Sequence, residues 1–426
     1  MPEAAVCGMY AAMGQHISLH VTLGYMPCLD SAPLVVAVEK GFASDEGLSL
    51  RLVRETSWVQ IRDRLTVGHF DGAHLPGPFA LAANLGFSPL VPALLVPMAL
   101  NLGGGALTVS NALATAMQQA GWENHLLEPL AAGTALKRVA EERRVKSLPP
   151  LRIAIGDAHS SQAYYLRYWL AACNLDHGSE VEIVSLPSPL MVDGLGAGAL
   201  DGFCAAEPWN SIAVDRQVGR IVAATAAIWR GGPDKVLGIG RQWGENNPAA
   251  LDALIRALYR AAQWCGNPGN TEELAGIMAA PRYLGVEGRL LLPGLTGDLV
   301  TAPGEVQSLA DFLVLERKAA NFPWASHALW FYSQMVLGGH VVHARERIAM
   351  VLETYRPDLY RRALRPVFAA MPGANIKVEG AMAAADYVGA SNGRLLLGPD
   401  GFFDGRVFDP DRLDDYLATS PAVPRN

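Results

Sequence analysis

Charged residues are scarce in this sequence of 426 residues, because Asp, Glu, Lys and Arg make up only 18% of it and apolar residues make up half. This composition does not favour disorder, and the length favours two well-packed lobes over a single core. Forty-one acidic residues outnumber 34 basic ones, and no Lys/Arg run is interleaved with aromatic residues. We therefore expect no direct binding to nucleic acid.

Cysteine is also rare, and its spacing argues against both a disulfide-stabilised fold and a zinc site. The five cysteines are scattered without a C-x-x-C pair: Cys7, Cys28, Cys173, Cys204 and Cys265. This pattern indicates reduced thiols, with neither a disulfide framework nor a zinc site. The N-terminal residues lack the basic and apolar regions of a secretory signal, so we expect a cytoplasmic protein.

Catalytic, cofactor and metal motifs are missing as well. The sequence has no G-x-S-x-G, P-loop or H-E-x-x-H motif. Residues 194–198, GLGAG, make a poor dinucleotide-binding fingerprint, because no predicted strand lies directly before them. His340 and His343 form H-x-x-H without a third ligand at metal spacing. We expect no enzyme activity, no cofactor and no metal.

A long stretch has no charged side chain at all, from Gly72 to Trp122. Its most apolar part, residues 90–100, contains Pro92 and Pro97 and is shorter than the roughly 20 apolar residues that a spanning helix needs. We therefore expect a buried strand and a crossover, and no membrane association.

Alternating strand and helix patterns are what the sequence does contain. Residues 57–78 and 187–209 repeat the order of helix, small-residue turn, Asp-Gly and apolar strand. Strands are predicted at 17–27, 48–53, 73–75, 151–156, 181–186 and 203–205, and helices at 31–40, from 57, at 160–174 and at 187–200. This rhythm predicts α/β architecture with the same topology in two lobes.

The lobe boundaries follow from two glycine-rich segments, residues 103–105 and 231–240. We predict that residues 1–104 form the first part of lobe I, residues 105–232 form lobe II, and residues 233–426 return to lobe I and add a C-terminal helical extension. Helices are expected at 248–266 and 309–319, an aromatic-rich core segment at 321–340, and a small helix near the C-terminus.

Predicted helix starts collect at one edge of each sheet. In parallel sheets ligands bind beyond the carboxyl ends of the strands, where the helix N-termini also point. The starts near Ser31, Ser57, Ser160 and Pro187 each offer free N–H groups and the positive end of a helix dipole. A small anion could be held there without a strongly basic protein.

Five segments, in this order, resemble one known family: EKGFASDEGLSLRL, SWVQIRDRLTVGHFDGAHLPGPFALAANLG, YYLRYWLAACNL, LDGFCAAEPWN and DKVLGIGRQW. They are similar to the nitrate-binding proteins of the NrtA/NasS type, relatives of the bicarbonate-binding CmpA type, from about Val21 to about Leu396. The resemblance implies an α/β, two-lobed periplasmic-binding-protein-like (type II) fold, here with extra C-terminal helices, that closes on nitrate or nitrite.

The resemblance also implies the ligand-binding residues. Trp58 matches a tryptophan that lines the anion site, Gln162 lies where nitrate-transport relatives carry a histidine, and Lys235 matches a lysine where bicarbonate binders carry an acid. An indole suits a planar anion, an amide donates two hydrogen bonds and an ammonium supplies a full positive charge. Without the resemblance, Trp58 would be a sheet-covering residue, Gln162 an exposed one and Lys235 a solvated one.

Two further residues lie at the same edge and support the predicted site. His74 ends a strand there, although a hydrogen-bonded structural histidine is equally expected. Asp30 could order the site or cap the helix that begins at Ser31, and we favour the cap. Ser57 and Gln60 form a capping-box pattern at the start of the helix that carries Trp58.

Three functions are considered for such a chain. The resemblance, with the N-terminus, favours a cytoplasmic NasS-type sensor that sequesters a NasT-type RNA-binding antiterminator of the response-regulator class and releases it when nitrate or nitrite binds. The alternative is the substrate-binding subunit of an ABC transporter for nitrate, nitrite or bicarbonate. An enzyme on the same scaffold is the third, and the sequence offers it no nucleophile.

Overall fold

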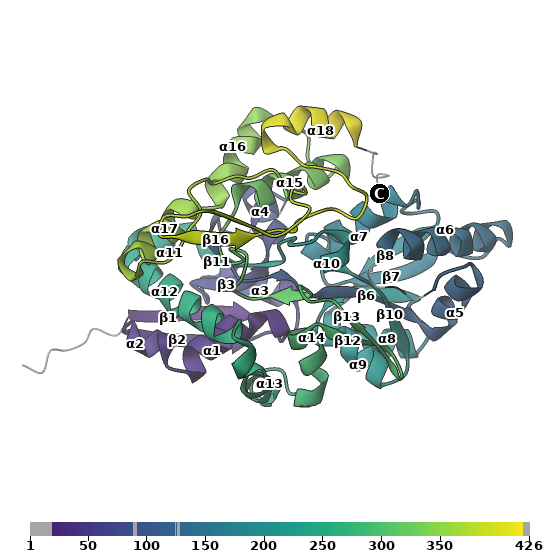
Figure 1. Cartoon of the computed structure of the whole chain (residues 1–426), viewed down its shortest axis with the longest axis horizontal. Helices are drawn as coiled ribbons and strands as arrows, with labels where there is room; N and C mark the ends of the chain where they lie inside the picture. The colour runs from purple at the N-terminus through teal and green to yellow at the C-terminus, as the bar shows by residue number, and fades with distance from the viewer. Residues whose placement is uncertain (1–18, 88–91, 124, 126–127, 421–426) are drawn as a thin grey trace, which may run out of the picture.

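Two twisted sheets lie side by side in this protein, each covered by helices, with the C-terminal part of the chain across both (Figure 1). The structure, a computed structural model, describes residues 19–87, 92–123, 125 and 128–420. Over these residues no helix combines the length and the apolar character that crossing a membrane requires.

The first sheet has the strand order β2-β1-β3-β11-β4 and forms the centre of lobe I. Its strands are β1 (Leu19–Tyr25), β2 (Leu48–Arg54), β3 (Gly72–Pro76), β4 (Leu94–Ala99) and β11 (Lys235–Gly240). β1 runs parallel to β2 and β3, whereas β11 runs antiparallel to β3 and β4. The antiparallel register places Lys235 opposite Pro76, so the first residue of β11 lies at the carboxyl end of β3.

The second sheet repeats this arrangement in lobe II, with the order β10-β6-β9-β7-β8. Its strands are β6 (Gly105–Ser110), β7 (Leu151–Ile155), β8 (Val181–Ser185), β9 (Gly202–Ala206) and β10 (Gly219–Ala224). β7 runs parallel to β8 and β9, and β6 runs antiparallel to β9 and β10. Because the two sheets match strand for strand when the second is read from β8, the predicted α/β class with equal topology in both lobes is confirmed.

The two glycine-rich crossings between the lobes lie together. Gly103 and Gly104 have φ angles of +66° and +86°, which L side chains rarely adopt, so glycine is required where β4 leads into β6. The Gly103 N–H donates to the carbonyl of Gly232 on the returning crossing, at 2.9 Å. The predicted limits of the lobes at residues 104 and 232 stay predictions.

Helices cover both faces of the two sheets (Figure 1). Lobe I carries α1 (Ala32–Glu39), α2 (Phe42–Asp45), α3 (Trp58–Thr66), α4 (Gly77–Asn84), α11 (Arg241–Asn246) and α12 (Pro248–Cys265). Lobe II carries α5 (Asn111–Gln119), α6 (Pro129–Val145), α7 (Ser161–Ala172), α8 (Ser188–Gly196), α9 (Trp209–Asp215) and α10 (Thr225–Ile228).

The C-terminal extension joins the two lobes. It contains α13 (Thr271–Ala279), α14 (Leu292–Thr296), β12 (Asp298–Ala302), β13 (Glu305–Ser308), β14 (Leu313–Val314), α15 (Ala325–Leu337), α16 (Arg345–Thr354), α17 (Pro357–Leu364), β15 (Asp386–Gly389), β16 (Arg394–Leu397) and α18 (Leu413–Thr419). Helix α15 packs against α4 of lobe I and α7 of lobe II. Its aromatic side chains, Trp330 and Phe331 among them, are buried, which confirms the predicted core segment.

The helix predicted at residues 309–319 is wrong. This segment contains β14, which pairs with β5 (Leu102–Gly103) at the lobe crossing. The carbonyl of Phe312 accepts from the Gly104 N–H, so the backbone polar groups of both segments are paired by tertiary contacts. Local helix preference could not compete with that pairing.

Candidate ligand-binding site between the lobes

All five residues predicted for the site lie in one cluster at the lobe boundary, and none is more than 6% exposed. Lobe I supplies Asp30 from the short 3₁₀ turn Leu29–Ser31, Trp58 from the first position of α3, His74 from β3 and Lys235 from the first position of β11. Lobe II supplies Gln162 from the first turn of α7. That these residues bind a ligand stays a prediction.

Lys235 is the centre of the cluster, and it is not the solvated lysine that its position in a glycine-rich segment suggested. Its side chain is 1% exposed, with Nζ 3.0 Å from Asp30 Oδ2 and 2.7 Å from Asp234 Oδ2. The ammonium also lies 5.9 Å from the centre of the Trp58 ring, within the range of a cation–π contact. One cation therefore bridges two carboxylates beneath an indole.

Gln162 closes the cluster from lobe II, and it is buried. Its Nε2 donates to Asp234 Oδ2 at 2.7 Å. The neighbouring Ser161 hydroxyl donates to the Asp234 carbonyl at 2.8 Å, and Ser160 caps α7 by accepting from the Ala163 N–H. The start of α7 is thereby held against the strand that carries Lys235.

Asp30 and His74 form a buried pair beside the lysine. His74 Nε2 lies 2.9 Å from Asp30 Oδ1, and a proton on Nε2 makes the ring the donor. The favoured reading of Asp30 as a helix cap is wrong, because its second oxygen accepts from Lys235 and α1 begins without a side-chain cap. The Ser31 hydroxyl instead donates to the carbonyl of Cys28, since the turn before α1 is already helical.

Trp58 reaches across the lobe boundary from a capped helix. Ser57 Oγ accepts from the Gln60 N–H as predicted, whereas the Gln60 side chain accepts from Thr56, one residue before the cap. A Cβ atom on Gly156, at the carboxyl end of β7 in lobe II, would lie 3.1 Å from Trp58 Nε1. The indole therefore occupies space that any side chain at position 156 would need.

The two carboxylates of the cluster differ in proton affinity. Burial alone would raise the pKa of Asp30, but the Lys235 ammonium and the His74 bond hold that pKa below its usual value. Burial raises the pKa of Asp234, the nearby Asp30 charge adds to this, and Lys235 only partly opposes it. Burial alone would lower the pKa of Lys235, yet the two carboxylates raise it, so the lysine stays charged.

Asp234 is the member of the cluster that the sequence did not single out. Successive residues of a strand point to opposite faces of the sheet. An acid directly before a lysine is therefore not expected to contact the side chain of that lysine. Asp234 lies just before β11, where that alternation does not apply. The only signal was its place in the resembling segment that begins with Asp234 and Lys235.

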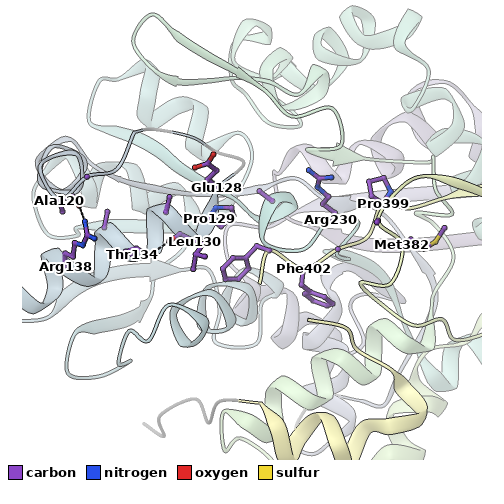
Figure 2. Close-up of a pocket in the computed structure, with 17 residues that line it drawn as sticks. Ala120, Glu128, Pro129, Leu130, Thr134, Arg138, Arg230, Met382, Pro399 and Phe402 are labelled. Carbon is purple, nitrogen blue, oxygen red and sulfur yellow. Dashed lines mark hydrogen bonds between the residues drawn. The ribbon is translucent and has the colours of Figure 1, made fainter. Parts of the chain in front are cut away.

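Other polar groups and cavities lie apart from this cluster. A cavity of about 760 Å³ lies between α6 and the C-terminal extension, with Ala120 and Arg138 toward one end of its lining and Pro399 and Met382 toward the other (Figure 2). His340 accepts or donates at the Tyr164 hydroxyl, while His343 pairs with Asp414, so the two histidines diverge. No group of three or more His, Cys, Asp or Glu residues within the described part of the chain is placed to hold a metal ion.

The paired lobes, with a polar cluster buried at their boundary, define the two-lobed architecture of periplasmic binding proteins. Structural comparison agrees: the crystal structure of the periplasmic nitrate-binding protein NrtA from Synechocystis is similar, with a TM-score of 0.81, 24% identity and coverage of 95% of this chain and 99% of that one. A ligand-binding component of an ABC-type import system from Staphylococcus aureus is similar with a TM-score of 0.60, 13% identity and coverage of 81% and 99%. The predicted periplasmic-binding-protein fold is therefore confirmed.

The chain belongs to the NMT1-like family, whose profile matches residues 15–279. It is 30% identical to the nitrate/nitrite binding protein NrtA of Synechococcus elongatus over 406 residues, 93% of this chain and 85% of that protein. It is 34% identical to the nitrate import ATP-binding protein NrtC of Synechocystis sp. over 350 residues, 82% of this chain, but it spans only half the length of NrtC. The predicted resemblance to nitrate-binding proteins is thus confirmed.

Proposed function

We propose that this protein binds nitrate or nitrite in the boundary between its lobes. The observation that carries the proposal is the convergence of the Lys235 ammonium and the Gln162 amide, from different lobes, beside the Trp58 ring. A flat oxyanion needs one positive charge, in-plane hydrogen-bond donors and an apolar surface for its face, and these three groups supply them. The similarity to nitrate/nitrite binding proteins supports this ligand class.

Binding at this cluster requires the lobes to part. Lys235 and Asp234 are each 1% exposed, so an anion reaches them only after Gln162 and Trp58 have separated. The ligand would then be enclosed when the lobes close again. If a partner protein binds the open and closed forms differently, the anion changes its affinity. A tenfold change in partner affinity requires a coupling free energy of about 1.4 kcal/mol between the two binding events.

Within this ligand class, we propose a sensor of the NasS type as the biological role. The protein would act in the cytoplasm, hold a NasT-type RNA-binding antiterminator while it is empty, and release that regulator when nitrate or nitrite binds. Genes for nitrate assimilation would then be read through. The five sequence segments resemble the family type to which such sensors belong together with transport proteins, so the support they give is shared by the second candidate below.

A second candidate is the substrate-binding subunit of a nitrate, nitrite or bicarbonate ABC transporter. It is favoured by the relatives, among which are a nitrate import protein and the bicarbonate transport protein CmpC of Synechococcus elongatus. The two roles share the anion site and differ in partner and compartment. Ligand binding alone therefore does not separate them.

Calorimetric titration with nitrate, nitrite and bicarbonate tests the ligand class. We expect heat and saturation with nitrate or nitrite, weaker binding of bicarbonate, and a loss of affinity of at least tenfold in Gln162→Ala. Gln118→Ala, on the exposed side of α5, is the matched control and should bind like the wild type. Absence of binding by both nitrogen oxyanions would contradict the proposal.

Co-purification with a NasT-type regulator, with and without nitrate, separates the two roles. The sensor role predicts a complex that nitrate or nitrite dissociates, with the protein in the cytoplasmic fraction of its cells. The transporter role predicts no such complex and recovery in an extracytoplasmic fraction. A complex that both anions leave intact would refute the proposed release.

A further inference from the structure

Asp234 already holds the donors that a bound oxyanion would need. Its Oδ2 accepts from Gln162 Nε2 at 2.7 Å and from Lys235 Nζ at 2.7 Å, one donor from each lobe. Its Oδ1 is buried and has no hydrogen-bond partner within the described part of the chain. The carboxylate is therefore bound through one oxygen only.

A carboxylate resembles nitrite and nitrate in the features that these donors recognise. All three are flat, carry one delocalised negative charge and present oxygen lone pairs in the plane of the group. An ammonium and an amide that bind one of them can bind another at the same place. Asp30 is not equivalent, because each of its oxygens has a partner, His74 and Lys235.

Charge makes simultaneous occupation unfavourable. With Asp30 and Asp234 both ionised, Lys235 already faces two negative groups, and a bound anion would be a third in a site from which water is excluded. Cys28, Tyr165 and Cys204 also interact with Asp234, and none of these three groups is a cation. The anion and the Asp234 contact therefore exclude each other.

We infer that the Asp234 side chain is a built-in competitor that occupies the oxyanion position of the empty closed protein and sets the anion concentration to which it responds. The inference rests on the proposed binding of nitrate or nitrite. The backbone of Asp234 is fixed, because its N–H donates to Asn101 and its carbonyl accepts from Gly77 and from the Ser161 hydroxyl. Once the lobes have opened for the anion and closed again, only the side chain has to have rotated away.

The competition is tested by nitrate titration of the wild type, Asp234→Ala and Asp234→Asn. Removing the carboxylate should raise nitrate affinity at least tenfold, and the amide should raise it less, because a neutral oxygen accepts more weakly from Lys235 and Gln162. Asp252→Asn is the matched control, since it changes the net charge equally on α12, where Asp252 pairs with Arg362. It should bind nitrate like the wild type.

The outcomes separate this inference from the function on which it rests. Nitrate binding by the wild type with equal or weaker binding by the folded Asp234→Asn variant would overturn the competitor and leave the anion site intact. Tighter binding by both variants supports it, as does binding that only the variants show. No nitrate or nitrite binding by any of the four proteins would instead refute the anion site itself.

Discussion

Replacing Lys235 with methionine should remove the charge on which the cluster depends. The change keeps the length of the side chain but leaves Asp30 and Asp234 buried without a cation, after the loss of contacts at 3.0 and 2.7 Å. Breaking one partner out of a buried ion pair costs about 3–5 kcal/mol, and we expect a loss of that size in the free energy of unfolding. Nitrate binding should be lost as well.

Urea unfolding measures the stability, with exposed Lys146→Met as the control, since Lys146 pairs with Glu142 on the surface and its loss should change stability far less than the loss of Lys235. Adding Asp234→Asn to Lys235→Met should recover part of the loss, because one unpaired carboxylate is removed. The loss should also shrink at acidic pH, where the unpaired acids are protonated. A change of less than about 1 kcal/mol at neutral pH would refute the buried bridge, given that figure for an exposed pair.

Three other substitutions test further parts of the structure. Gly156→Ala should lower anion affinity at least fivefold, which corresponds to about 1 kcal/mol of strain, because the new Cβ would crowd the tryptophan of the cluster in the closed form. Unchanged affinity in the nitrate titration would refute the close approach of the two residues. Burial raises the pKa of Glu207 from 4.5 to about 7. The stabilisation that the protonated carboxyl gives to the folded state is therefore fully present below pH 4.5 and is lost as pH rises through 7. At 1.36 kcal/mol per pKa unit, the free energy of unfolding measured with urea should fall by about 3 kcal/mol by about pH 8 in the wild type but not in Glu207→Gln. Equal pH profiles of the two proteins would contradict the assignment. Gly133→Ala should lower the free energy of unfolding by about 1–3 kcal/mol, because its Cβ would lie 2.1 Å from Cys173 Sγ. Gly276→Ala is the control, since a Cβ there would meet open space, and it should not change stability. Equal melting temperatures of the two variants would contradict the packing.

The architecture was largely predictable because its signals are local. Apolar strands, helix starts and Asp-Gly turns recur in the same order in both halves, and β3 and β9 lie where such turns end. The bridging role of α15 was not predictable, because an aromatic helix can be buried against any surface. Its partners, α4 and α7, are more than a hundred residues away in the sequence.

The candidate site was predictable only in part. The resemblance gave Trp58, Gln162 and Lys235, whereas the residues alone favoured a sheet-covering, an exposed and a solvated side chain. Asp30 was misread because a cap is a local interaction and its real partners, His74 and Lys235, are 44 and 205 positions away. Such tertiary pairing of charges leaves no periodic pattern in a sequence.

A crystal structure of the protein grown with nitrate is the most direct test of the anion site. The account predicts a flat ligand between the lobes, within hydrogen-bond distance of Lys235 Nζ and Gln162 Nε2, with its face toward Trp58 and with the Asp234 carboxylate rotated away. Nitrate bound elsewhere, or an unchanged cluster in which Asp234 still accepts from both donors, would contradict it.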